Sequence, residues 1–141
     1  MKRPVYRKAI SGRGRGLAKF LGDLELDVLR VVWARGEATV ADVRSALSRR
    51  RRLAYTTVMT VMVRLTDKGL LRRYKSGRRY LYSPAKSREE LAAGLAGEVA
   101  RALLADFGDL AIAQFVKEVG SINADALARL AELAKDEGTD E

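Results

Sequence analysis

Residues 53–84 read LAYTTVMTVMVRLTDKGLLRRYKSGRRYLYSP, and this stretch decides the fold of the chain. In its first half, an apolar stripe recurs at helical spacing and predicts a helix over 55–68, closed by Gly69. The stripe consists of Val58, Val61, Met62 and Leu65. After the glycine the period changes, and two short strands are predicted at about 70–75 and 79–83. A helix that leads directly into a tight hairpin is therefore the centre of the predicted fold.

The face of this helix opposite the apolar stripe has an unusual composition. It carries hydroxyl groups, a methionine and one cation, namely Thr56, Thr57, Met59, Thr60 and Arg64. A solvent-facing helix more often carries Glu and Lys, and threonine is a costly residue in a helix. Threonine hydroxyls and methyl groups contact base edges when a helix lies in the major groove of DNA. The pattern therefore predicts a recognition helix.

The turn of the predicted hairpin is Ser76-Gly77, and cations lie on both sides of it. The three that cluster there are Lys75, Arg78 and Arg79. This charge favours a wing whose tip contacts phosphate groups, and an ordinary exposed turn is the alternative.

Two further helices are predicted upstream. Asp23 can cap the first, which ends at Gly36, and Thr39 with Asp42 in the capping-box position starts a shorter second one. The residues between them, near 38–40, suit a short strand. The resulting order of helix, short strand, helix, helix and basic hairpin is that of a winged helix-turn-helix domain.

Four adjacent arginines, at 49–52, separate the second helix from the recognition helix. Four neighbouring cations cannot all be buried or paired, so a solvated loop is one interpretation. Because Arg51 and Arg52 lead into the recognition helix, contact with phosphate groups is the interpretation that we favour.

The C-terminal part of the chain is predicted to be helical and to pair with a second copy. Ser87 and Glu90 form a capping box, and three short amphipathic helices follow, which bury too little surface to be stable alone. The fold class is therefore mainly α with a small β-hairpin: a winged helix-turn-helix domain over 21–85, a helical dimerisation lobe over 86–136, and an acidic tail over 137–141. The candidate dimerisation residues are Leu91, Leu95, Val99, Leu103, Leu110, Phe115, Val116, Leu127 and Leu130.

The charge of the 141-residue chain is divided between its two halves. Residues 1–86 carry 22 Lys and Arg against 6 Asp and Glu, whereas residues 87–141 carry 5 against 12, which together give the formal net charge of +9. The basic part suits a polyanion, and the acidic part would be repelled by it. Residues 1–20 show no helical or strand period and are predicted to form a flexible basic arm, which contacts phosphates or is a passive tail.

The composition excludes several classes of chemistry. Histidine and cysteine are both absent, so there is no Cys/His zinc site, thiolate nucleophile or Ser-His-Asp triad. We expect no cofactor, no metal and no enzymatic activity, although a carboxylate or Ser-Lys enzyme stays formally open. No apolar run approaches the ~20 residues that a membrane span needs. The N-terminus lacks the apolar core of a signal peptide, so we expect a cytoplasmic protein that does not enter membranes.

Four pieces of the sequence carry a resemblance to a known family. They are LGDLELDVLRVVW at 21–33, TTVMTVMVRL at 56–65, KGL at 68–70 and YLYSP at 80–84. With them the chain resembles, over about residues 20–136, the penicillinase repressor family, the BlaI/MecI-type regulators. Members of that family are homodimeric winged-helix repressors, which implies the same for this chain and suggests β-lactamase or related genes as targets. The resemblance places DNA contacts at Thr56, Thr57, Met59, Thr60 and Arg64, and in the wing at Lys75 and Arg78 or Arg79.

The chain departs from that family at the inactivating signal. Staphylococcal members are cleaved by a membrane-linked protease system at an Asn-Phe bond in the first dimerisation helix. Here the only asparagine is Asn123, which precedes Ala124, and Glu98-Val99 stands roughly where that bond would lie. Copper-responsive relatives carry a cysteine cluster that this chain lacks. A sensor or protease partner is therefore left open.

Two functions follow from these features. The first is a transcriptional repressor that binds a palindromic operator in double-stranded DNA as a homodimer and occludes a promoter. The second is a nucleoid-associated protein that binds duplex DNA with little sequence preference. The specificity ratio separates them, because a repressor prefers its site by ~10³-fold or more over random DNA.

Overall fold

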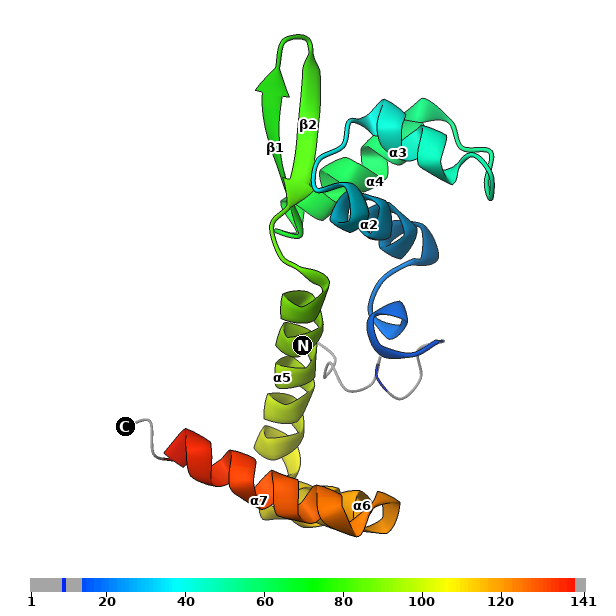
Figure 1. The fold of residues 1–141 in the computed structure, drawn as a ribbon. Helices are drawn as coiled ribbons and strands as arrows, with labels where there is room; N and C mark the ends of the chain where they lie inside the picture. The colour runs from blue at the N-terminus through cyan, green and yellow to red at the C-terminus, as the bar shows by residue number, and fades with distance from the viewer. Residues whose placement is uncertain (1–8, 10–13, 139–141) are drawn as a thin grey trace. The chain divides into compact units, whose positions relative to one another are not determined.

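The computed structural model describes residue 9 and residues 14–138. Its chain divides into two compact units, Met1–Glu98 and Val99–Glu141, and the division falls inside a single helix (Figure 1). Among the described residues the elements are η1 (Gly16–Lys19), α2 (Asp23–Arg35), α3 (Val40–Leu47), α4 (Tyr55–Asp67), β1 (Leu71–Ser76), β2 (Arg79–Pro84), α5 (Arg88–Phe107), α6 (Asp109–Ile122) and α7 (Ala124–Gly138). The mainly helical fold with a small β-hairpin is confirmed.

Helix α2 begins one residue earlier than its predicted cap implies. Gly22 occupies the N-cap position, and its backbone N–H donates to Oε1 of Glu25 at 3.0 Å. Asp23 is the first helical residue, where its negative charge still complements the helix dipole. The helix ends at Arg35, and the C-cap residue Gly36 has a φ of 80° that favours glycine.

The capping box of α3 is present as predicted. The backbone N–H of Asp42 donates to the Thr39 hydroxyl at 3.1 Å, and the backbone N–H of Thr39 donates to the Asp42 carboxylate at 3.0 Å. The short strand predicted near 38–40 is a single β-bridge between Ala38 and Tyr82. This bridge holds the second strand of the hairpin against the segment that leads into α3.

Helix α4 buries the stripe that its periodicity predicts. Val58, Val61, Met62 and Leu65 are its buried residues, and they belong to one core cluster with side chains of α2 and α3. The hairpin that follows pairs β1 with β2 antiparallel, with Tyr74 opposite Leu81 and Ser76 opposite Arg79. Gly77 takes a positive φ of 65° in the turn.

The segment before α2 differs from the predicted flexible arm. Residues Gly16–Lys19 form a turn of 3-10 helix, and Leu17 is only 7% exposed within the core of the first unit. Its neighbours Ala18 and Leu21 pack against the same core. Ordered structure therefore begins before residue 20, because Leu17, which lies among glycines and cations in the sequence, is buried in the core. Most of the predicted arm lies outside the described residues.

The start of α5 belongs to the first unit, which corrects the predicted domain boundary. Its capping box is present, since Ser87 and Glu90 exchange hydrogen bonds at 3.2 and 3.1 Å. Leu91, which the sequence assigned to the dimerisation lobe, is 7% exposed and lies in the winged-helix core, and Leu95 packs against that core. At the start of α5, these two apolar side chains therefore pack within the first unit.

The second unit consists of the end of α5 with α6 and α7. Gly108, with a φ of 56°, separates α5 from α6, and Oδ1 of Asn123 accepts from the backbone N–H of Asp125 at 2.9 Å to cap α7. Among residues 99–137, whose burial the structure describes, no side chain is buried. Within the part of the chain that the structure describes, no helix is both long and apolar enough to cross a membrane.

Candidate nucleic-acid interface

The exposed face of α4 carries the side chains that the sequence singled out. The core holds the opposite face, and all five predicted side chains lie at the surface: Thr56, Thr57, Met59, Thr60 and Arg64. Thr60 donates its hydroxyl hydrogen to the carbonyl oxygen of Thr56 at 2.8 Å. This bond fixes the orientation of the hydroxyl while its lone pairs stay available to a donor group. Met59 is 39% exposed, which is a large apolar contact area for a solvent-facing position.

Two contacts hold α4 against α2. At the end of α4, Nζ of Lys68 donates to Oε2 of Glu25 at 2.7 Å. Partial burial of the Glu25 carboxyl acts to raise its pKa, but the bonds from Lys68 and from the Gly22 backbone outweigh this, and the pKa lies below its ordinary value. In the turn before α4, Arg51 forms an ion pair with Asp27 of α2 at 3.4 Å. These contacts fix the position of α4, and with it the exposed face, relative to α2.

The turn between α3 and α4 carries the arginine run. Nε of Arg44 donates to the carbonyl oxygen of Leu53 at 2.9 Å, which ties the end of α3 to the residue before the N-cap of α4. Arg49, Arg50 and Arg52 are exposed. Of the two arginines that the sequence assigned to phosphate contact, Arg51 is thus engaged by a carboxylate, whereas Arg52 has no ion pair or hydrogen bond to another described residue.

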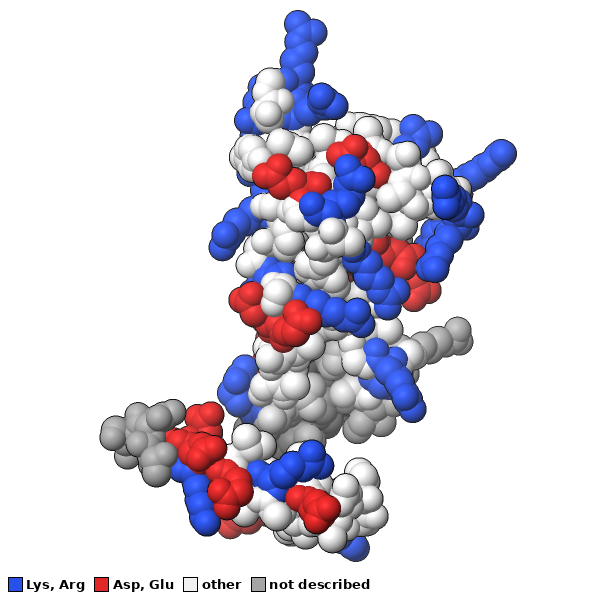
Figure 2. Space-filling view, in the orientation of Figure 1, with Lys and Arg blue, Asp and Glu red and all other residues white. Residues whose placement is uncertain are grey.

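The hairpin forms a basic wing beside this helix-turn-helix. Lys75, Arg78 and Arg79 are exposed at its tip, as expected. The guanidinium of Arg73 lies 4.6 Å from the centre of the Tyr80 ring, a cation–π contact. The Tyr74 hydroxyl donates to Oε1 of Glu37 at 2.5 Å, and this bond raises the pKa of Tyr74. Figure 2 shows Lys and Arg side chains over the wing tip and over the turn between α3 and α4.

Sequence reasoning missed some residues of this surface and misplaced others. Arg44 was not predicted, because its partner Leu53 is nine residues away and no periodicity indicates such a contact. The exposed tyrosines of the wing, Tyr74 and Tyr80, were not among the predicted site residues. In the second unit, the predicted apolar residues are Val99, Leu103, Leu110, Phe115, Val116, Leu127 and Leu130; all are partly or fully exposed. No group of residues that could hold a metal ion occurs in the described part of the chain.

A helix-turn-helix with a hydroxyl-rich exposed helix, followed by a basic two-stranded wing, defines a winged helix-turn-helix protein of the DNA-binding class. The sequence model of the penicillinase repressor family matches residues 21–136. The chain belongs to the penicillinase repressor family, whose members are DNA-binding transcriptional regulators.

Individual relatives agree with this membership. Transcriptional regulator BlaI of Mycobacterium tuberculosis is 48% identical over 122 residues, which cover 84% of this chain and 88% of the relative. The penicillinase repressor of Bacillus licheniformis is 33% identical over 64 residues, 45% of this chain and 50% of the relative. A solved structure of monomeric B. licheniformis BlaI in complex with the blaP half-operator is 30% identical in sequence. The match covers 50% of this chain and 85% of the BlaI chain, with a TM-score of 0.43.

Proposed function

We propose that this chain represses transcription by binding an inverted-repeat operator as a homodimer and occluding the promoter. The observation that carries the proposal is the exposed face of α4, on which threonines and a methionine replace the Glu and Lys of a solvated helix. Family membership and the basic wing support the same function. The supporting relatives are a transcriptional regulator and a penicillinase repressor.

In this proposal the two surfaces of the first unit have different tasks. Thr56, Thr57, Met59 and Thr60 meet base edges in the major groove, with Arg64 at the far end of the same face. The wing cations, which are Lys75, Arg78 and Arg79, contact backbone phosphates, so they add affinity without sequence information. Arg52 in the turn adds a further phosphate contact.

The second unit supplies the dimer. Its exposed large apolar side chains include Leu110, at 68%, Phe115 and Val116, and monomeric proteins rarely expose apolar groups so densely. A dimer carries two recognition helices, which matches an operator whose half-sites are about one helical turn apart. Linking two half-sites raises affinity by effective concentration, so dimer dissociation is a route to release.

The proposed target gene is inferred from a relative, and the proposed release signal from a difference between this sequence and the family's cleavage bond. Because the B. licheniformis relative is a penicillinase repressor, we propose a β-lactamase or a related gene as the target. Release by cleavage at an Asn-Phe bond is not part of the proposal, since Asn123 precedes Ala124. A partner protein, a small ligand or cleavage at another bond then provides the signal.

The experiment that tests the proposal separates base reading from phosphate binding. Binding to a duplex from the DNA upstream of the gene and to a random duplex is measured by fluorescence anisotropy. Thr60→Ala should lower specific affinity by on the order of 1–3 kcal/mol and leave random-sequence binding nearly intact. Arg78→Ala, the matched wing variant, should weaken both similarly.

A second measurement distinguishes the repressor from the nucleoid-associated protein. The ratio of specific to random affinity should be ~10³ or more for a repressor. A ratio near one, with Thr60→Ala and Arg78→Ala behaving alike on both duplexes, would identify a protein that binds DNA without sequence preference. The basic wing is the feature that favours this second candidate.

The contribution of the N-terminal basic residues is tested by deletion. We propose that they bind DNA phosphates. Removal of residues 1–13 should then make the slope of log binding constant against log salt concentration shallower by about 0.9 per lost phosphate contact. The deletion ends before Leu17, because that side chain belongs to the core. An unchanged slope would mean that the segment is passive.

A further inference from the structure

The hairpin has almost no core of its own beyond its base. In β1 only Leu71 is buried, and the five residues that follow it are exposed. In β2 Tyr82 is buried, and its bridge to Ala38 consists of two backbone hydrogen bonds of 2.9 Å. Figure 1 shows the hairpin extending beyond α2, α3 and α4. Because an isolated two-stranded hairpin is only marginally stable in water, the direction of its outer part depends on contacts with the rest of the unit.

Tyr74 supplies such a contact from the exposed part of the hairpin. Its hydroxyl donates to Oε1 of Glu37 at 2.5 Å, across 37 positions of the sequence. Tyr74 lies two residues before Ser76, the last residue of β1. Among the described hydrogen bonds that join the hairpin to the rest of the first unit, this bond is the nearest to the tip. Since the Tyr74 side chain is 46% exposed, the bond adds little to the core and acts mainly on the direction of the wing.

The acceptor, Glu37, lies on a short segment whose other residues are held in place. It belongs to the connection between α2 and α3, residues 36–39. The backbone N–H of Gly36 donates to the carbonyl oxygen of Val32 at 2.8 Å. Ala38 is fully buried in its bridge to β2, and Thr39 caps α3. A bond to this segment therefore restricts the hairpin more than a bond to a mobile loop would.

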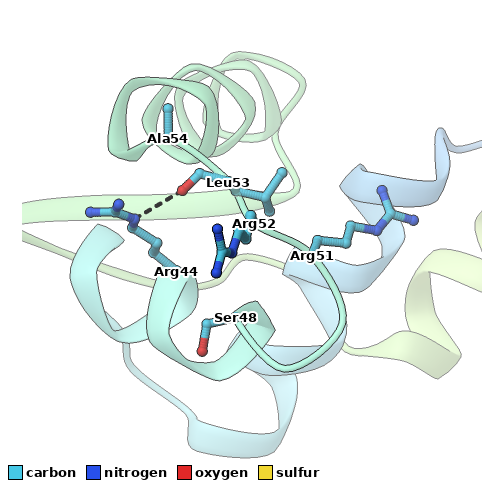
Figure 3. Close-up of a pocket in the computed structure, with 6 residues that line it drawn as sticks. All are labelled: Arg44, Ser48, Arg51, Arg52, Leu53 and Ala54. Atoms are coloured by element: carbon cyan, nitrogen blue, oxygen red, sulfur yellow. Dashed lines mark hydrogen bonds between the residues drawn. The ribbon is translucent and has the colours of Figure 1, made fainter.

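The recognition helix is fixed to the same part of the unit. Just before α4, the carbonyl oxygen of Leu53 accepts from Nε of Arg44 in α3 at 2.9 Å (Figure 3). At the end of α4, Lys68 donates to Glu25 of α2. Hydrogen bonds to α2, α3 and their connection thus hold both the recognition helix and the wing. The folded protein sets the separation of these two surfaces before any DNA is bound.

We propose that Tyr74 and Glu37 are a positioning pair, whose bond holds the wing at the distance from the recognition helix that one DNA half-site requires. The proposal rests on the proposed function, because it concerns how the two surfaces named there are held. Neither side chain has to touch the DNA. A wing that already has its bound direction loses less conformational freedom on binding, so the bond raises affinity by at most its own free energy.

The first experiment measures the operator affinity of the full-length protein in a double-mutant cycle. Tyr74→Phe removes only the hydroxyl and should weaken binding on the order of fivefold, the net effect of one hydrogen bond. Glu37→Ala removes the acceptor together with a negative charge that repels DNA, so its own effect combines two opposite changes. In the Glu37→Ala background, Tyr74→Phe should have no further effect, because the bond is already absent. In the Glu37→Gln background, which keeps an acceptor oxygen, Tyr74→Phe should still weaken binding.

Tyr80→Phe is the matched control, since it removes the same group from the same hairpin. Tyr80 is opposite Lys75 in the register, whereas Tyr74 is opposite Leu81. Because neighbouring residues of a strand point to opposite faces, the two tyrosines lie on different faces of the hairpin. None of the described hydrogen bonds joins Tyr80 to Glu37, so the effects of Tyr80→Phe and Glu37→Ala should add. Equal coupling of both tyrosines to Glu37 would overturn the proposal.

A scan with methylphosphonates separates positioning from a general loss of stability. One phosphate of the operator at a time is replaced by the uncharged group, and the wing positions are those whose effect disappears in Arg78→Ala. In Tyr74→Phe the loss at these wing positions should become smaller, while the losses at all other phosphates stay as in the wild type. A variant that is only less stable loses affinity with the same profile as the wild type. An unchanged profile in Tyr74→Phe would therefore overturn the proposal.

The direction of the wing is also measured without DNA. Backbone NMR relaxation of residues 75–79 reports fast movement of the tip. Tyr74→Phe should increase this movement, and Tyr80→Phe should leave it as in the wild type. Equal mobility in the wild type and in Tyr74→Phe would overturn the proposal. If the wild type binds no duplex with sequence preference, the proposed function fails, while the relaxation measurement still decides whether the pair fixes the wing.

Discussion

Helices α4 and α6 have 13 and 14 residues and each carries an apolar stripe, yet only one of them buries it. Helix α4 has four buried side chains, whereas α6 has none. The difference lies in the surroundings and not in the helices. Helix α4 is covered by α2, α3 and the hairpin, while within its unit α6 packs on α7. An apolar stripe therefore identifies the face of a helix that will be buried. It does not identify the partner that buries it, which can be another element of the same chain or a second molecule.

The largest expected effect comes from truncation of the buried stripe. Leu65→Ala should lower the free energy of unfolding of the first unit by about 2–5 kcal/mol, because it removes a fully buried side chain and leaves a cavity. Trp33, the single tryptophan of the chain, lies in this unit and reports its unfolding in urea. The matched variant Leu110→Ala in α6 should leave that transition unchanged. Equal shifts would mean that the two units unfold as one.

The next effect concerns the uncovered stripe. Val116→Asp in α6 places a charge on the proposed dimer interface and should produce a monomer with roughly 10²-fold weaker binding to the full operator. Sedimentation and DNA-shift assays on the same sample provide the measurement. Leu95→Asp is not an equivalent probe, because Leu95 packs against the core of the first unit. A variant that stays dimeric, or a monomer with undiminished affinity, would contradict the dimer.

A smaller effect is expected at the helix caps of the two units. Thr39→Ala removes the cap of α3 and should lower the stability of the first unit by about 1 kcal/mol, measured by Trp33 fluorescence in urea. Asn123→Ala removes the cap of α7 in the second unit and should leave the Trp33 transition where it is. A shift of that transition by Asn123→Ala would show that the units are coupled.

The smallest effect is a pH dependence confined to the first unit. The backbone N–H of Thr39 is the main cause that lowers the pKa of Asp42 in the folded protein. The stabilisation from this carboxylate is therefore complete above about pH 4 and is lost as the pH falls through the lowered pKa. In Asp42→Asn, the free energy of unfolding should fall less steeply as the pH is lowered. Urea unfolding at a series of pH values provides the measurement. Parallel curves for wild type and variant would contradict this assignment.

Local signals predicted most of the first unit. The stripe of α4, the boxes at Thr39 and Ser87 and the turn at Gly77 each depend on residues a few positions apart, and the structure confirms all of them. The exposed threonine face followed directly, since the residues opposite a buried stripe must be exposed.

Contacts between distant residues were not predictable in this way. Nε1 of Trp33 donates to the carbonyl oxygen of Lys86 at 3.0 Å, across 53 positions, and fixes the segment that leads into α5. This contact and the burial of Leu91 assign the first turns of α5 to the first unit, which its regular periodicity could not reveal. Leu17 was missed because the glycines and cations around it are typical of an unfolded segment.

The exposed face of α4 has a consequence for how such a protein changes over generations. Its outward side chains take no part in the core, and the oriented Thr60 hydroxyl bonds only to its own helix. Replacing them changes what the helix presents to a partner at small cost to folding, because exposed substitutions usually shift stability by less than ~0.5 kcal/mol. The cations of the wing and of the α3–α4 turn lie on other elements and are untouched by such replacements. A duplicated copy of this chain can therefore acquire a new preference through a few substitutions on one helix while its general attraction to polyanions stays constant.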